Sequence, residues 1–226
     1  LAISKTNKTL GEKQIPLMGV MAAFIFAAQM LNFPVAGGTS GHFLGGALAA
    51  IVLGPWAGIL VMTAVIAVQG LLFQDGGLLV MGANIFNMGI LTAVIGFGLY
   101  RMVGGAKKGL RLTIAGAAAW LATMAAALLT ALQLWLSGTS RLEIVLPAML
   151  GVHILIGVGE ALITVAALAF IERTRPDLLN AEKTAASGTE GGKTPRKVNW
   201  VVVGAAVGLV VLAVGAILFS FRFVED

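Results

Sequence analysis

Seven long apolar runs follow one another along this chain of 226 residues, and they limit its possible folds more than any other feature. Most of them contain the roughly 20 residues that an α-helix needs to cross the hydrocarbon core of a bilayer. The sequence is 58% hydrophobic and only 11% charged, which leaves too little polar surface for a water-soluble domain. We therefore predict an all-α fold, a polytopic membrane helical bundle with about seven hydrophobic segments, one of them short. The runs are 15–34, 42–53, 56–73, 82–100, 112–136, 144–171 and 199–219.

The second run, 42–53, is the short one. At 1.5 Å per residue it would span about 18 Å as a helix, so it is a steep half-span, a buried short helix or part of a longer bent helix. If basic loops face the cytoplasm, 42–73 crosses the membrane twice, and the stretches GGTSGH and QDGG both lie on the external side. The basic loops that give this orientation are 1–13, 101–111 and 172–198.

The chain divides into three parts: a bundle over 1–171, a polar cytoplasmic linker over 172–198, and an appended transmembrane helix over 199–226. Because the sequence starts with Leu1 and has no signal-peptide pattern, we expect a further N-terminal segment to precede it. The absence of cysteine excludes disulfides, thiolate metal sites and cysteine nucleophiles. The net charge of +5 comes from basic loops, so we expect a lipid bilayer and no nucleic acid as partner.

Few polar side chains lie at membrane depth, where they usually face the bundle interior or a water-filled cavity. His42 follows a glycine-rich turn in which Thr39 and Ser40 can cap a helix that begins near His42. Alternatively, His42 binds a metal ion, since neutral imidazole suits nickel, cobalt, copper and zinc. The whole set is Gln29, Asn32, His42, Gln69, Gln74, Asp75, Asn84, Asn87, Gln133, His153 and Glu160.

The other polar residues also have two interpretations each. Asn84 and Asn87 are three residues apart on one helix face. Their amides orient a loop at the site, or they make structural hydrogen bonds alone. Asp75 is an ordinary turn residue or an acceptor that orients a ligating histidine. His153 and Glu160, two helical turns apart, form a buried polar pair that serves as a proton relay or as structural hydrogen bonding. A single histidine at the external mouth is too few donors for a transition-metal site.

Two stretches resemble the CbiM/NikM family, the substrate-binding (S) components of energy-coupling-factor (ECF) transporters for cobalt and nickel. They are PLMGVMAAFIFAAQMLNFPVAGGTSGHFLGGALAAIVLGPWAGILVMTAVIAVQGLLFQDGGLLVMGANIFNMG and HILIGVGEALIT. The resemblance covers most of 16–171. It implies a subunit of a prokaryotic cell membrane that captures the ion outside. It also implies a transmembrane coupling (T) subunit and two ATPase subunits as partners.

The resemblance further implies that His42 is one of four nitrogen ligands in a square plane, a geometry that suits nickel(II). In the family, the others come from an N-terminal Met-His segment that is not in this sequence, so we expect the chain as given to bind nickel or cobalt poorly. The last helix weakly resembles a small accessory subunit of the NikN or CbiN type.

Two other functions stay open at this point. A self-sufficient metal channel or secondary transporter would use His153 and Glu160 as a proton relay. An intramembrane serine protease of the rhomboid type would use Ser40 of GTSG as nucleophile and His153 as base. The sequence has no Walker-type phosphate-binding loop, so we expect no enzyme activity here and ATP hydrolysis on partner subunits.

Overall fold

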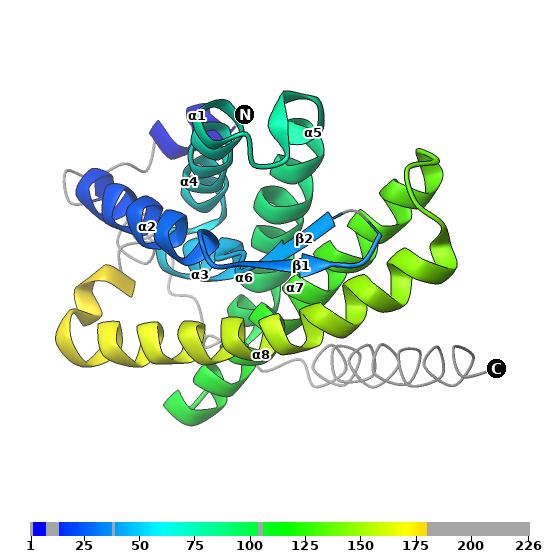
Figure 1. Ribbon diagram of the computed structural model, residues 1–226. Coiled ribbons are helices and arrows are strands. Elements are labelled where there is room, and N and C mark those ends of the chain that lie inside the picture. The colour runs from blue at the N-terminus through cyan, green and yellow to red at the C-terminus, as the bar shows by residue number, and fades with distance from the viewer. Residues whose placement is uncertain (1, 8–13, 38, 104–105, 180–226) are drawn as a thin grey trace.

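The computed structural model describes residues 2–7, 14–37, 39–103 and 106–179, which form a helical bundle with one small β-hairpin (Figure 1). Large apolar side chains such as Leu72, Leu155 and Phe170 are mostly exposed, as expected for helices that face lipid. The chain is therefore a multi-pass membrane bundle, and the seventh predicted segment, 199–219, lies outside the described residues. The helical stretches long and apolar enough to cross a membrane are Pro55–Phe73, Gly77–Met102, Lys108–Leu136 and Leu142–Thr174.

The elements follow one another with short connections. The first half contains α1 (Ala2–Asn7), α2 (Gln14–Gln29), β1 (Asn32–Val35), β2 (Thr39–His42), α3 (Gly46–Leu53) and α4 (Pro55–Val68). The second half contains the π-helical turn η1 (Gln69–Phe73), α5 (Gly77–Asn84), the π-helical segment η2 (Ile85–Leu91), α6 (Thr92–Met102), α7 (Lys108–Leu136) and α8 (Leu142–Thr174). The segments α5, η2 and α6 continue into one another as a single membrane-length helix.

The centre of the bundle is α3, whose eight residues are all buried. Its small side chains, including Ala49 and Ala50, let neighbouring helices approach closely. At 1.5 Å per residue the helix is about 12 Å long, too short to cross the hydrocarbon core. Of the three alternatives for the run 42–53, the structure has the buried short helix.

The segment between α2 and α3 differs from the all-α prediction. The apolar run 15–34 is helical only as far as Gln29, and the residues after it form an antiparallel hairpin with Asn32 opposite His42. Pro34 lacks a backbone N–H and favours an extended chain, and Gly37 takes a φ of 94° at the turn. The polar stretch 1–13, predicted as a loop, also contains the helix α1.

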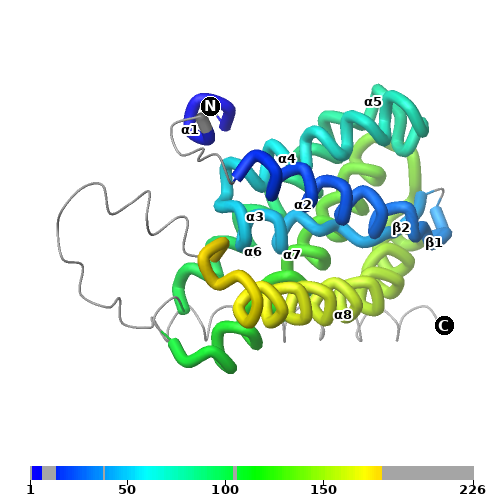
Figure 2. Tube along the Cα trace, turned by 90° about the vertical axis from the view of Figure 1, so that its left-hand side faces the viewer, coloured from blue at the N-terminus to red at the C-terminus, as the bar shows by residue number. Residues whose placement is uncertain are grey.

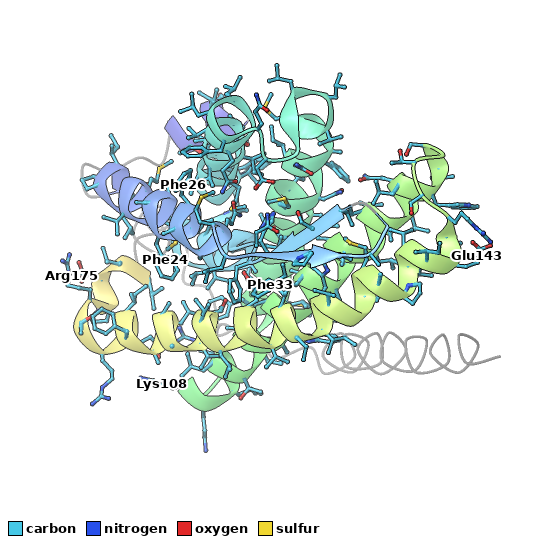
Figure 3. All side chains as sticks on the ribbon, in the orientation of Figure 1. Phe24, Phe26, Phe33, Lys108, Glu143 and Arg175 are labelled. Atoms are coloured by element: carbon cyan, nitrogen blue, oxygen red, sulfur yellow. The ribbon has the colours of Figure 1, made fainter. Side chains whose placement is uncertain are left out.

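The two ends of the bundle differ in charge. Figure 2 shows α5 and the hairpin at one end, and α1 and the C-terminal end of α8 at the other. At this second end Glu172 forms ion pairs with Lys108 at 3.3 Å and Arg111 at 3.0 Å. Glu143 and Arg175 lie at opposite ends of α8 (Figure 3). The concentration of basic residues around Glu172 supports a cytoplasmic position for that end.

Candidate metal site in a membrane cavity

An open cavity of about 930 Å³ lies between the hairpin, α5, α7 and α8. Its size is that of a typical ligand pocket. Strand β2 forms one wall, and the turn before α5 forms another. The structure thus brings together seven residues that the sequence singles out from distant parts of the chain: Thr39, Ser40, His42, Asp75, Asn84, Gln133 and His153.

His42 is the last residue of β2 and is partly buried. Its Nδ1 lies 2.7 Å from the carbonyl oxygen of Phe43. Because a carbonyl only accepts hydrogen bonds, Nδ1 is the donor, and the lone pair of the neutral ring is then on Nε2. An imidazole oriented through one nitrogen, with the other unprotonated, is the usual arrangement of a metal-ligating histidine.

His153 supports the strand that carries His42. Its Nδ1 donates to the Met149 carbonyl oxygen at 2.7 Å, and the side chain is 4% exposed. An ideal Cβ on Gly41 would lie 2.9 Å from His153 Cε1 and 3.2 Å from Nε2, so the ring packs against the backbone of β2. The two histidines of the chain, far apart in sequence, therefore meet at one strand.

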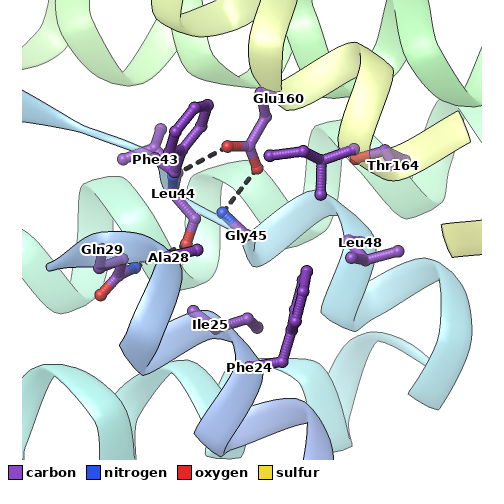
Figure 4. Close-up of a pocket in the computed structure, with 11 residues that line it drawn as sticks. Phe24, Ile25, Ala28, Gln29, Phe43, Leu44, Gly45, Leu48, Glu160 and Thr164 are labelled. Atoms are coloured by element: carbon purple, nitrogen blue, oxygen red, sulfur yellow. Dashed lines mark hydrogen bonds between the residues drawn. The ribbon is translucent and has the colours of Figure 1, made fainter. Parts of the chain in front are cut away.

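Glu160 has different partners from those that the sequence suggests. Its carboxylate accepts the backbone N–H of Leu44 at 3.0 Å and that of Gly45 at 2.6 Å (Figure 4). Since His153 bonds to the backbone of its own helix, the two side chains do not form the predicted pair. Two helical turns separate them by about 10 Å along α8. The link between β2 and α3 binds the carboxylate instead.

Thr39 and Ser40 do not cap a helix, because both lie in β2 and α3 begins later, at Gly46. The residue before that helix is Gly45, which offers no side-chain cap. Asp75 lies in the turn after η1, where its N–H donates to the Gln69 carbonyl oxygen at 3.2 Å. The group that orients His42 is the Phe43 carbonyl rather than this carboxylate.

Asn84 and Asn87 have separate environments. Asn84 lines the cavity, whereas Asn87 is 1% exposed and connects η2 to α7. The Asn87 amide donates to Thr130 Oγ1 at 3.0 Å and to Gln133 Oε1 at 2.7 Å, and the Gln133 amide donates back at 3.2 Å. Asn87 thus fixes two polar residues of the cavity wall.

Sequence reasoning does not identify three contributors to the site: Gly41, the Phe43 carbonyl, and Gln29 as a partner of the link between β2 and α3. The Gln29 amide donates to the Leu44 carbonyl oxygen at 2.7 Å. Its position in an apolar run is a signal of a buried polar contact, but local sequence does not identify the partner. Among the residues that the structure describes, no three His, Cys, Asp or Glu side chains gather as a metal site.

The fold defines a multi-pass membrane protein with an open cavity that polar and apolar side chains line together. Residues 1–178 match the CbiM family, described as "Cobalt uptake substrate-specific transmembrane region", and the chain belongs to this family. It is a family of metal transport components and not of enzymes, which removes the support for Ser40 as a protease nucleophile.

Similar proteins carry related descriptions. A "Putative metal transport protein" of Haloquadratum walsbyi is 43% identical over 79% of this chain and 82% of its own length. A "Putative fused nickel transport protein NikMN" of Archaeoglobus fulgidus is 42% identical over 79% of this chain, which spans 59% of that relative. The crystal structure of a truncated transition metal transporter superimposes with a TM-score of 0.71 at 34% identity, covering 76% of this chain and 86% of that one.

Proposed function

We propose that this chain is the substrate-capture (S) component of an ECF transporter that takes up nickel or cobalt ions across a prokaryotic cell membrane. The observation that carries the proposal is the orientation of His42. Its Nδ1 is held by the Phe43 carbonyl and its ring lines an open cavity, so Nε2 is available to an ion that enters. Both ions bind imidazole nitrogen, so His42 can be a ligand of nickel or of cobalt.

Energy for uptake comes from other subunits in this proposal. The sequence contains no Walker-type loop for ATP. The chain would therefore work with a transmembrane coupling subunit and two ATPase subunits, and an accessory membrane subunit would correspond to the appended segment 199–226. Membership of the CbiM family supports these assignments.

Isothermal titration of nickel and cobalt tests the site, with the purified protein carrying an N-terminal segment that begins Met-His ahead of Leu1. His42→Ala should abolish high-affinity binding, because it removes the donor. Ser137→Ala is the matched control: Ser137 lines the same cavity but is exposed, and its hydroxyl contacts only Leu134 and Thr139 among the described residues. Its affinity should equal that of the wild type. Unchanged binding by His42→Ala would refute the assignment.

Uptake of radioactive nickel separates the proposed subunit from a self-sufficient channel. Cells that express the chain with its coupling and ATPase subunits should accumulate nickel, and cells with inactive ATPases should not. The proton relay that a secondary transporter would need has no support in the side-chain geometry, because Glu160 bonds to the backbone of the link between β2 and α3. Accumulation without ATPase activity would favour the channel.

A further inference from the structure

One peptide group connects His42 to a buried carboxylate on α8. The imidazole donates from Nδ1 to the Phe43 carbonyl oxygen at 2.7 Å. The other end of that peptide group, the Leu44 N–H, donates to Glu160 Oε2 at 3.0 Å. Hydrogen bonds in such a chain polarise one another, so the carboxylate strengthens the acceptor that holds the imidazole. The orientation of the ring thus depends on how Glu160 holds the following peptide.

Glu160 is one half of a clamp on this turn. Its second oxygen, Oε1, accepts the Gly45 N–H at 2.6 Å, and Gln29 of α2 donates to the Leu44 carbonyl oxygen at 2.7 Å (Figure 4). The glutamate is 4% exposed and the glutamine 1%, so both side chains are shielded from water. Two helices far apart in the sequence therefore fix the short link between His42 and α3.

The link needs such a clamp because it changes direction sharply. Gly45 has a φ of +76°, and an ideal Cβ there would lie 2.8 Å from Ile25 Cγ1. No side chain of the link itself caps α3. The Glu160 carboxylate accepts N–H groups just before the helix start, where unpaired donors carry a partial positive charge. The Glu160 side chain thus satisfies two backbone donors at the start of α3.

We propose that Glu160 is a positioning residue for metal capture, which sets the orientation and basicity of the His42 imidazole through the Phe43–Leu44 peptide group. This inference rests on the proposed function, because it takes His42 as a ligand of the nickel or cobalt ion. Glu160 does not touch the ion and acts through the backbone. Groups that hold the second nitrogen of a ligating histidine change metal affinity by about 10–100-fold when removed.

The test is Glu160→Gln in the same protein that is used for the His42→Ala titration. Glutamine has the same size, but its NH₂ group faces one of the two backbone N–H donors, so one hydrogen bond is lost. We expect nickel affinity to fall by about 10–100-fold. The visible absorption of bound Ni²⁺ should also shift, since one nitrogen ligand changes orientation and basicity.

Thr164→Val is the matched control. Thr164 lies one turn further along α8 and is 1% exposed. Together with Glu160 it lines the small pocket drawn in Figure 4, and its hydroxyl has no hydrogen-bond partner among the described residues. The control should keep both the affinity and the spectrum of the wild type. If Glu160→Gln lowers thermal stability alone, and affinity and spectrum stay unchanged, the inference is overturned.

Two further variants keep the outcome decisive. Glu160→Asp retains both acceptor oxygens on a shorter side chain, and we expect weaker nickel binding than in the wild type but stronger than in Glu160→Gln. If Glu160→Gln does not fold, wild-type affinity and spectrum in Glu160→Asp overturn the inference.

Nickel binding that survives His42→Ala refutes the proposed function. Binding lost in His42→Ala but unchanged in Glu160→Gln refutes the role of Glu160 alone.

Discussion

Gly41 on β2 and the imidazole of His153 on α8 are in direct contact. The ring occupies the space that a side chain at position 41 would need, since an ideal Cβ there would lie 2.9 Å from His153 Cε1. The same Cβ would lie 2.9 Å from Ile156 Cδ1. Both obstacles belong to one helix, so the separation of β2 from α8 is set by the absence of a side chain at Gly41.

Gly41→Ala should therefore move β2 away from α8 and displace the neighbouring His42. We expect a loss of about 1–3 kcal/mol in the free energy of unfolding, the usual cost of an overpacked site, together with weaker nickel binding. Thermal unfolding in detergent and calorimetric titration measure the two effects.

Gly82→Ala is the control for this prediction. Gly82 lies in α5, and an ideal Cβ there meets nothing within 4 Å. Alanine should leave stability unchanged or raise it, because it favours the helix more than glycine does. Equal behaviour of the two alanine variants would show that β2 does not depend on the contact with His153.

The amide pair of Asn87 and Gln133 should stabilise the packing of η2 on α7. The two side chains exchange hydrogen bonds of 2.7 Å and 3.2 Å. We expect each alanine variant to destabilise the fold and the double variant to cost less than the sum, with a coupling energy of about 1 kcal/mol. A double-mutant cycle by thermal unfolding measures it. A coupling of zero would mean that the two amides act independently.

Apolar runs predict the spans of this protein well because crossing a bilayer sets the minimum length of a helix. The runs 112–136 and 144–171 fall within α7 and α8. The hairpin is not predictable in this way, because it joins two four-residue strands whose main partners are each other and α8. A short polar and glycine-containing segment carries too little periodicity to show that pairing.

The sequence predicts which residues belong to the candidate site, but it does not predict the hydrogen bonds that they make. His42 and His153 are conspicuous because polar side chains are rare within apolar runs. Helical spacing also places His153 and Glu160 on one face. It does not show that a distant strand-to-helix turn supplies two N–H groups to Glu160, since this follows from how α8 packs on the hairpin. Local periodicity predicts a helix face, whereas tertiary packing decides its partners.

The ion pairs of Glu172 should matter more than the exposed pair at the other end of α8. Glu172 is 11% exposed and contacts both Lys108 and Arg111, whereas Arg141 and Glu143 are 76% and 74% exposed. Glu172→Gln should lower the free energy of unfolding by about 1 kcal/mol, and Glu143→Gln should have no measurable effect. Thermal unfolding at low and high salt compares them. Equal effects would mean that burial does not strengthen the Glu172 pairs.

Cysteine labelling should reveal the orientation of the bundle, because the chain has no cysteine of its own. Thr139, between α7 and α8, and Lys107, just before α7, are both exposed and lie at opposite ends of α7. The position of the basic residues predicts that Thr139 is external and Lys107 cytoplasmic. A membrane-impermeant maleimide should label Thr139→Cys on intact cells, and Lys107→Cys only after permeabilisation. The unmodified protein should remain unlabelled in both conditions. Labelling of Lys107→Cys alone on intact cells would reverse the orientation and place the mouth of the His42 cavity on the cytoplasmic side, which would contradict capture of the ion from outside.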